Sequence, residues 1–304
     1  MRFVSYGPVD NCRAGILLGE TIADLEATMR SAGVGAPVSD ITLFLQQDNW
    51  AGMLGKLKSA AAREKPIPLN SVRLGPPVPV PRKLLIAGAN TYTHVNEAKP
   101  LIGDIPPPPY PAILGKATSS IAGPFDNVIM PPETKKLDYE VELGVVIGKK
   151  TRRISKAQVR DHVAGFVTIN EMSARDIQLG EHQKYPFYRM HYLGKSFDTF
   201  CPMGPALVTT DEITWGKPLK LKTWVNGKIR QDGDTSDLVH GVEELVSYCS
   251  SAMTLYPGDV ISTGSPAGVA FFMQPQGFLQ PGDIVRCEVE GIGAIENHIV
   301  AERL

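Results

Sequence analysis

The chain of 304 residues has few cysteines, no excess of charge of either sign and no long apolar run. Its cysteines are far apart in the sequence, which matches neither a zinc motif nor a disulfide framework: Cys12, Cys201, Cys249 and Cys287. We therefore expect each to be a small buried or partly buried side chain. Because 31 basic residues balance 32 acidic ones, neither nucleic acid nor an anionic membrane surface is favoured as a partner.

No segment approaches the roughly 20 apolar residues that a membrane span needs. Residues 1–6 also lack the apolar region of a signal peptide, so we expect a cytoplasmic protein. Hydrophobic residues make up 43% of the chain, enough for one large core or for one large and one small domain. The 29 glycines and 25 prolines predict many turns and strands.

The N-terminal region predicts a hairpin, with strands at 2–6 and 14–18, and then helices. One helix is short and carries its apolar face over 22–29, and a second is expected from about 43 to 63. The proline-rich run 75–81 indicates a semi-rigid linker, since proline fits neither a helix interior nor a central strand. We therefore predict a small domain over 1–75 and a larger one over 76–304.

Three carboxylates alternate along a predicted strand at residues 137–148. A side-chain period of two places Asp138, Glu140 and Glu142 on one face. Carboxylates one pleat apart in an apolar strand cost free energy unless a cation lies between them, and all-oxygen ligation suits magnesium, manganese or calcium. The alternative is the solvent-facing acidic side of an edge strand. This strand alone favours neither interpretation.

Two further segments carry candidate chemistry. His94 and Glu97 are three residues apart, so on one helical turn the carboxylate could orient the imidazole to activate water; the alternative is a solvated turn with an incidental histidine. Ser173 and Asp176 have capping-box spacing, which predicts a helix beginning there and leaves Glu171 at a strand end.

Together these segments resemble the fumarylacetoacetate hydrolase family over roughly residues 80–300. The resemblance rests on Asn90, with His94 four residues later and Glu97 three beyond that, on the Glu140/Glu142 strand, and on segments 170–178, 195–205, 226–231 and 263–269. It implies a mainly β (α+β) fold, with a mixed β-sandwich roll in the catalytic domain, a small N-terminal domain and a homodimer.

The resemblance also implies roles for particular residues. Glu140, Glu142 and Glu171 would bind a divalent metal ion, Mg²⁺ or Mn²⁺, with Ca²⁺ as a further possibility. His94 and Glu97 would form the catalytic, water-activating pair on a lid. Lys195 would be catalytic, and the expected substrate-binding residues are Arg175, Gln178 and Ser265.

The sequence departs from the family pattern at two positions. Ser265 replaces a threonine and keeps its hydroxyl. Glu171 replaces an aspartate and lengthens the ligand arm by about 1.5 Å. We therefore expect a longer or water-mediated metal contact at Glu171 and a preference for a larger or more tolerant ion than magnesium.

The function implied is that of a metal-dependent hydrolase that cleaves a carbon–carbon bond in a 2,4-diketo acid, such as an acylpyruvate or fumarylpyruvate of aromatic-compound catabolism. Decarboxylation or tautomerisation of oxaloacetate and hydration of 2-oxo-pentenoates use the same enolate chemistry and stay open. A relative that binds a 2-oxo acid without catalysis is the alternative outside enzymes.

Overall fold

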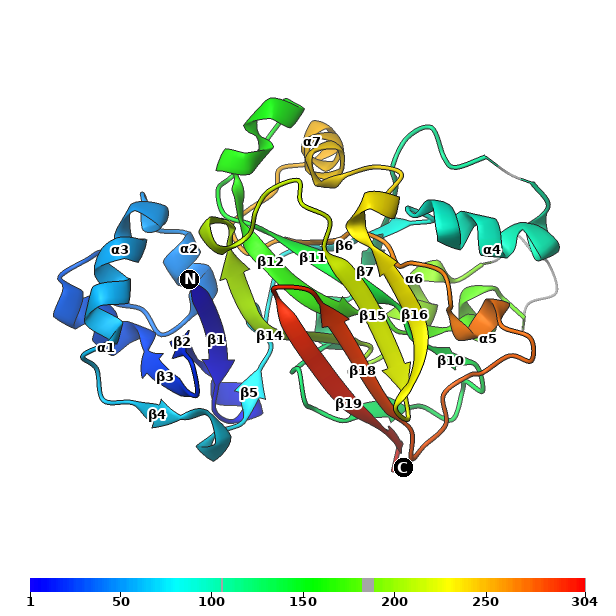
Figure 1. Ribbon diagram of the computed structural model, residues 1–304, viewed down its shortest axis with the longest axis horizontal. Helices are drawn as coiled ribbons and strands as arrows, with labels where there is room; N and C mark the ends of the chain where they lie inside the picture. Colours follow the sequence, from blue (N-terminus) through cyan, green and yellow to red (C-terminus); the bar gives the residue numbers. More distant parts are fainter. Residues whose placement is uncertain (105, 182–188, 304) are drawn as a thin grey trace.

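A computed structural model describes residues 1–104, 106–181 and 189–303, and Figure 1 shows its arrangement. The fold is α+β and dominated by sheets, which confirms the mainly β prediction. The N-terminal elements are β1 (Arg2–Tyr6), β2 (Arg13–Leu18), β3 (Thr21–Asp24), α1 (Leu25–Ala32), α2 (Ile41–Leu45), α3 (Trp50–Ala61), β4 (Ile67–Pro68) and β5 (Leu74–Gly75). β1 and β2 form the predicted hairpin, with Phe3 opposite Ile16.

The predicted single helix from 43 to 63 is wrong. The chain ends α2 at Leu45 and begins α3 at Trp50. Between them Asn49 has φ of 57°, in the left-handed region that interrupts a right-handed helix. Apolar periodicity continues across this break, which is why the sequence pattern did not reveal it.

The largest sheet runs through both halves of the chain. Its strand order is β4-β3-β2-β1-β14-β12-β11-β17-β6-β7, and Arg2 of β1 pairs with Val208 of β14. The strands after residue 75 are β6 (Leu84–Gly88), β7 (Ala112–Lys116), β11 (Val141–Ile147), β12 (Val163–Asn170), β14 (Cys201–Thr209) and β17 (Val260–Ser262), with β8 (Ile121–Ala122) beside β14. The division into domains at residue 75 stays a prediction.

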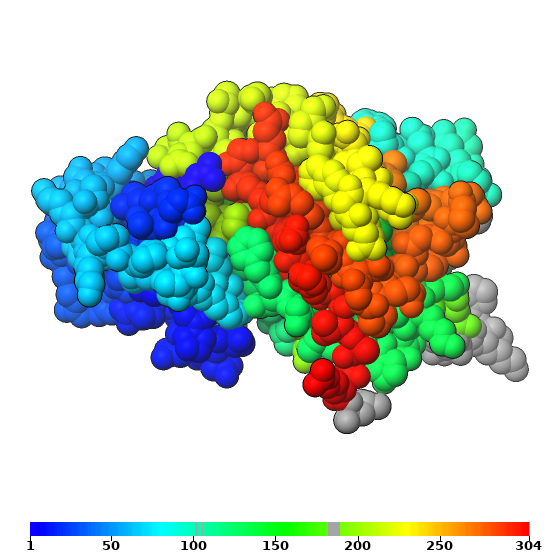
Figure 2. All heavy atoms as spheres, turned by 60° about the horizontal axis from the view of Figure 1, so that its bottom comes forward, coloured from blue at the N-terminus to red at the C-terminus, as the bar shows by residue number. Residues whose placement is uncertain are grey.

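A second sheet has the order β16-β15-β18-β19-β9. Its strands are β9 (Val128–Met130), β15 (Lys220–Val225), β16 (Lys228–Asp234), β18 (Ile284–Val289) and β19 (Gly293–Ala301). One apolar cluster takes buried side chains from both sheets, among them Val145 of β11 and Val285 of β18, so the two sheets enclose a common core. In Figure 2 the C-terminal strands cross the middle of the visible face, with the N-terminal elements beside them.

Short elements complete the described chain. A two-stranded sheet joins β10 (Leu137–Asp138) to β13 (Ser173–Ala174), and the remaining helices are α4 (Tyr92–Ile102), α5 (Arg175–Gln178), α6 (His191–Lys195) and α7 (Val242–Ala252). The 3₁₀ turns cover Val9–Asn11, Leu69–Ser71, Thr118–Ser120, Lys156–Asp161, Thr210–Glu212, Thr235–Asp237 and Ala270–Phe272.

Two predictions around the acidic strand need correction. Residues 137–148 are not one strand, because β10 ends at Asp138 and β11 begins at Val141. The solvent-facing edge strand is also wrong: β11 lies between β12 and β17, and all its residues are buried.

The predicted cap at Ser173 is wrong as well. Ser173 pairs with Asp138 in β13, and α5 begins at Arg175 without a side-chain cap. Asp176 instead accepts hydrogen bonds from the Thr134 hydroxyl (2.6 Å) and the Lys135 amide (2.9 Å). Strand pairing therefore determines the backbone conformation of Ser173, where the local pattern predicted the start of a helix.

All four cysteines are free; Cys12 is partly exposed and the other three are buried, as predicted. Among the residues that the structure describes, no helix has both the length and the apolar character to cross a membrane. The cytoplasmic location and the homodimer stay predictions.

Candidate active site

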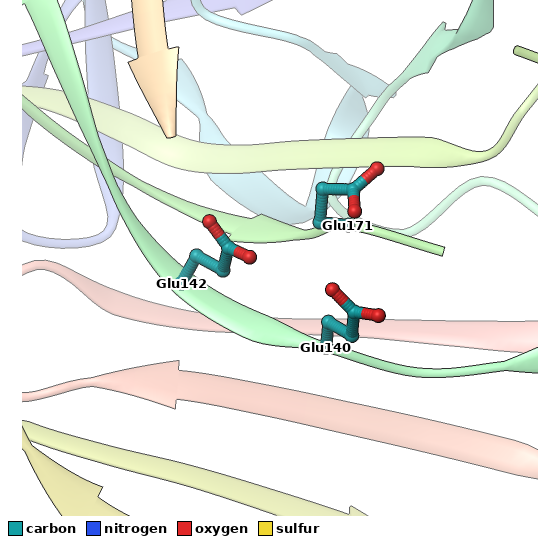
Figure 3. Close-up of side chains that lie close together, drawn as sticks. All are labelled: Glu140, Glu142 and Glu171. Atoms are coloured by element: carbon teal, nitrogen blue, oxygen red, sulfur yellow. The ribbon is translucent and has the colours of Figure 1, made fainter. Parts of the chain in front are cut away.

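Three buried glutamates converge where β11 and β12 pair (Figure 3). Glu140 lies just before β11, Glu142 lies within it, and Glu171 follows β12. The register brings them together because the Glu171 amide donates to the Glu140 carbonyl over 2.8 Å. One carboxylate oxygen of each lies within 4.8 Å of the others, and the residues are 5%, 1% and 0% exposed.

The electrostatics of this cluster fit a bound cation. Burial, reinforced by the charges of Glu171 and Glu140, raises the pKa of Glu142 to about 8. Burial would also raise the pKa of Glu140, but Arg175 and Lys195 outweigh it and lower that pKa to about 2. Three converging carboxylates, one of which is electrostatically uncompensated, are a suitable donor set for a hard divalent ion. The site therefore fits a divalent metal ion.

Hydrogen bonds hold Glu142 in place. Its Oε2 accepts from the Ser262 hydroxyl (2.6 Å) and from the Gly264 amide (2.7 Å). Gly264 has φ of 104°, a conformation that favours glycine, and a Cβ there would lie 2.9 Å from the Asn90 side chain. The loop after β17 thus fixes one oxygen of Glu142 through backbone that only glycine readily adopts.

The predicted cationic residues lie at the same cluster. Lys195 Nζ contacts Glu171 Oε2, lies 3.4 Å from Glu140 Oε2 and donates to the Ser173 hydroxyl over 2.9 Å. Glu140 and Glu171 outweigh burial and raise the pKa of Lys195, so this side chain carries a proton. Lys195 therefore lies at the glutamate cluster, and its catalytic role stays a prediction.

Arg175 and Gln178 are both buried on α5. The Arg175 guanidinium contacts Glu140, donates from Nε to Asp138 Oδ2 over 2.8 Å, and donates from Nη1 to Gln178 Oε1 over 3.0 Å. Asp138 is thus occupied by Arg175 and stands apart from the three converging glutamates. The substrate-binding roles of Arg175 and Gln178 stay predictions.

His94 and Glu97 meet on α4, as their spacing predicts. His94 Nδ1 lies 2.6 Å from Glu97 Oε1, and Glu97 Oε2 accepts from the Gly268 amide over 2.8 Å. The Phe272 ring packs edge-on against the imidazole, with centroids 5.6 Å apart. Glu97 is therefore anchored at both oxygens, which fixes the ring orientation of His94. The role of the pair in moving protons stays a prediction.

The loop after β17 contains two hydroxyls with different surroundings. Ser265 Oγ accepts from Gln231 Nε2 over 2.7 Å, and its carbonyl accepts from the Thr91 hydroxyl over 2.7 Å. Thr263 Oγ1, in contrast, is buried without a hydrogen-bond partner among the described residues. The substrate-binding role of Ser265 stays a prediction, and Thr263 is a second candidate that sequence reasoning missed, although the same motif contains it.

Sequence reasoning also missed Lys116, the last residue of β7. Its ammonium is fully buried and lies 2.6 Å from Glu171 Oε1. Lys116 is the one buried residue of β7, and the sequence does not reveal that its charge is internal or that its partner lies 55 residues away.

The fold is dominated by sheets, and its buried glutamates fit a divalent metal. The loop after β17 connects them to the histidine–glutamate pair, because Gly264 bonds Glu142 and Gly268 bonds Glu97. These features define a class of candidate metal-dependent proteins. Residues 83–300 match the family model described as fumarylacetoacetate (FAA) hydrolase, C-terminal. The chain therefore belongs to the fumarylacetoacetate hydrolase family, which confirms the resemblance.

Relatives and a solved structure show the same membership. The chain is 42% identical to human oxaloacetate tautomerase FAHD2A, mitochondrial, over 86% of this chain and 79% of that one. It is 36% identical to a fumarylacetoacetate hydrolase domain-containing protein 2 homolog of Dictyostelium discoideum, over 98% and 97%. A solved structure of maleylpyruvate hydrolase from Sphingobium sp. SYK-6, in complex with manganese(II) and pyruvate, is also similar. The match spans 100% of each chain, with a TM-score of 0.78 and 28% identity.

Proposed function

We propose that this protein is a metal-dependent enzyme that interconverts the keto and enol forms of a small 2-oxo dicarboxylic acid, with oxaloacetate as the first candidate. The observation that carries the proposal is that one loop anchors both parts of the site: the Gly264 amide bonds Glu142 of the buried glutamate cluster, and the Gly268 amide bonds Glu97 of the His94–Glu97 pair. The tautomerase names of relatives near 40% identity support this substrate over an acylpyruvate.

The three glutamates would hold the divalent ion, which when bound would polarise the 2-oxo acid and favour its enolate. His94 would take the proton from C3 of the keto form and return it to the 2-oxygen, so atoms and charge balance. Glu97 would orient the imidazole and stabilise its protonated form. Lys195 and Arg175 would place positive charge beside the substrate carboxylates.

Carbon–carbon hydrolysis of an acylpyruvate is the second candidate, in which the same His94–Glu97 pair would serve a different proton transfer. Here His94 would take a proton from water, the resulting hydroxide would add to the 4-carbonyl, and cleavage of the C3–C4 bond would release the pyruvate enol and a carboxylic acid. The manganese and pyruvate named for the Sphingobium hydrolase also support this candidate.

The test compares both reactions in the same preparation. Metal-stripped protein is assayed with and without Mn²⁺ for loss of the ultraviolet absorbance of enol-oxaloacetate, and separately for breakdown of acylpyruvates. We expect Mn²⁺-dependent acceleration of tautomerisation that His94→Ala reduces. Acceleration of acylpyruvate breakdown alone would favour hydrolysis, and no acceleration of either reaction by Mn²⁺-loaded protein would contradict both candidates.

A further inference from the structure

Glu171 is bonded through both carboxylate oxygens, and its two lysine partners differ in how they are held. Oε2 contacts Lys195, while Oε1 accepts from Lys116 over 2.6 Å. The Lys116 side chain is 0% exposed and that of Glu171 is 1% exposed, so water does not replace either partner. The ability of Glu171 to bind a metal therefore depends on which of its oxygens each lysine bonds.

Lys116 has no spare donor. Its ammonium has three N–H groups, and three acceptors surround it: Glu171 Oε1, the Met172 carbonyl at 3.0 Å and the Phe200 carbonyl at 2.7 Å. Two of these acceptors are backbone atoms next to structured segments, so the ammonium is fixed in position. Lys195, in contrast, has three side-chain acceptors among the described residues: Glu140, Glu171 and the Ser173 hydroxyl.

We propose that Lys116 is a positioning residue for the metal site: by holding Glu171 Oε1, it leaves Oε2 as the oxygen for a metal, which would there take the place of the Lys195 ammonium, and so favours Mg²⁺ and Mn²⁺ over Ca²⁺. This inference rests on the metal site of the proposed function. Mg²⁺ requires near-ideal octahedral geometry, whereas Ca²⁺ takes six to eight oxygens and accepts a bidentate carboxylate. A glutamate that can offer only one oxygen disfavours the higher coordination number.

The contact between Lys116 and Glu171 also explains how the site accommodates the extra methylene of Glu171. The expectation of a larger ion assumed a carboxylate arm free to reach into the site. Lys116 removes that freedom, because the arm extends to a fixed ammonium on β7. The longer side chain thus serves a second contact and need not displace the metal.

The variant K116M removes the ammonium with little change in side-chain length. K116R keeps the charge, but its planar guanidinium cannot direct the same three bonds. K83M is the matched control: Lys83 lies just before the neighbouring strand β6 and pairs at 3.3 Å with the buried Asp259, outside the glutamate cluster.

The experiment is calorimetric titration of each metal-stripped protein with MnCl₂, MgCl₂ and CaCl₂. We expect the ratio of Mn²⁺ to Ca²⁺ affinity to fall by about 10- to 100-fold in K116M, the usual effect of losing a group that orients a ligand. K116R should lower the ratio as well, and K83M should leave it unchanged. Loss of a nearby positive charge alone would change the affinities for both ions alike, so the ratio isolates the geometric effect.

A Mn²⁺ to Ca²⁺ ratio that stays within about twofold of the parent in K116M would overturn the inference, even if both affinities change. If K116M does not fold, the ratio in K116R decides by the same criterion. Should the unmodified protein bind no divalent ion, the proposed metal site fails, and that result is distinct from an unchanged ratio in a protein that binds metal.

Discussion

The two halves of the candidate site are held in different ways. The three glutamates are at most 5% exposed and lie within or directly beside the paired strands β11 and β12, whereas the side chains of His94 and Glu97 lie on α4 and are 18% and 16% exposed. Strand pairing fixes the first half through the backbone. The second half depends on one helix and on the contact of Glu97 with Gly268. Metal binding and proton transfer should therefore be separable by mutation.

Removal of the metal should produce the largest effect. Treatment with a chelator should abolish turnover, because without the cation the 2-oxo acid is neither bound well nor polarised toward its enolate. Mg²⁺ or Mn²⁺ should restore it, as measured by steady-state assays on dialysed protein. Full activity in a preparation shown by elemental analysis to contain no metal would contradict this half of the account.

Substitutions of His94 and Glu97 on α4 should leave metal binding intact. We expect His94→Ala to lower kcat by roughly 10²- to 10⁴-fold, the usual contribution of a general base, and Glu97→Gln to lower it less. Calorimetry should show a nearly unchanged Kd for Mn²⁺ in both variants. Normal turnover in His94→Ala would show that the proton is moved by another group.

Changes at Glu171 should act on metal affinity. Glu171→Ala removes one of three anionic ligands, and we expect a loss of at least about 10- to 100-fold in Mn²⁺ affinity. Glu171→Asp keeps the carboxylate and should retain the metal. If Glu171→Ala binds Mn²⁺ and turns over like the parent, Glu171 is not a ligand.

The smallest effect on activity is expected at a distance from both halves. The Trp50 indole donates to the buried Gly148 carbonyl over 2.9 Å and packs against Phe44. Trp50→Phe leaves that carbonyl without its donor, so the free energy of unfolding should fall by about 1–3 kcal/mol. Chemical denaturation measures this loss, and kcat should not change. A large fall in kcat would mean that the N-terminal region supports the site more closely than its position suggests.

Sequence reasoning succeeded where local chemistry decides the structure. The predicted N-terminal hairpin forms between β1 and β2, and helical spacing brought His94 to Glu97. It failed where distant strands decide it. Ser173 has the spacing of a helix cap, yet pairing with Asp138 makes it part of a strand.

The candidate site shows the same limit. Alternation placed Asp138, Glu140 and Glu142 on one face, but Asp138 pairs with Arg175 instead of joining the cluster. Only the resemblance to a family pointed to Glu171 as the third member. Lys116 was missed because its partner lies on another strand, and no local pattern relates β7 to the end of β12. The two-sheet arrangement likewise came from the resemblance, since strand patterns alone do not specify which sheets pack together.

The most direct test of the central claim is a crystal structure of Mn²⁺-soaked protein with anomalous data collected above the manganese absorption edge. The account predicts one strong anomalous peak between Glu140, Glu142 and Glu171, with Glu171 bound through Oε2 and Lys116 still at Oε1. A peak elsewhere, or no peak with Lys195 still bonded to Glu171, would contradict it.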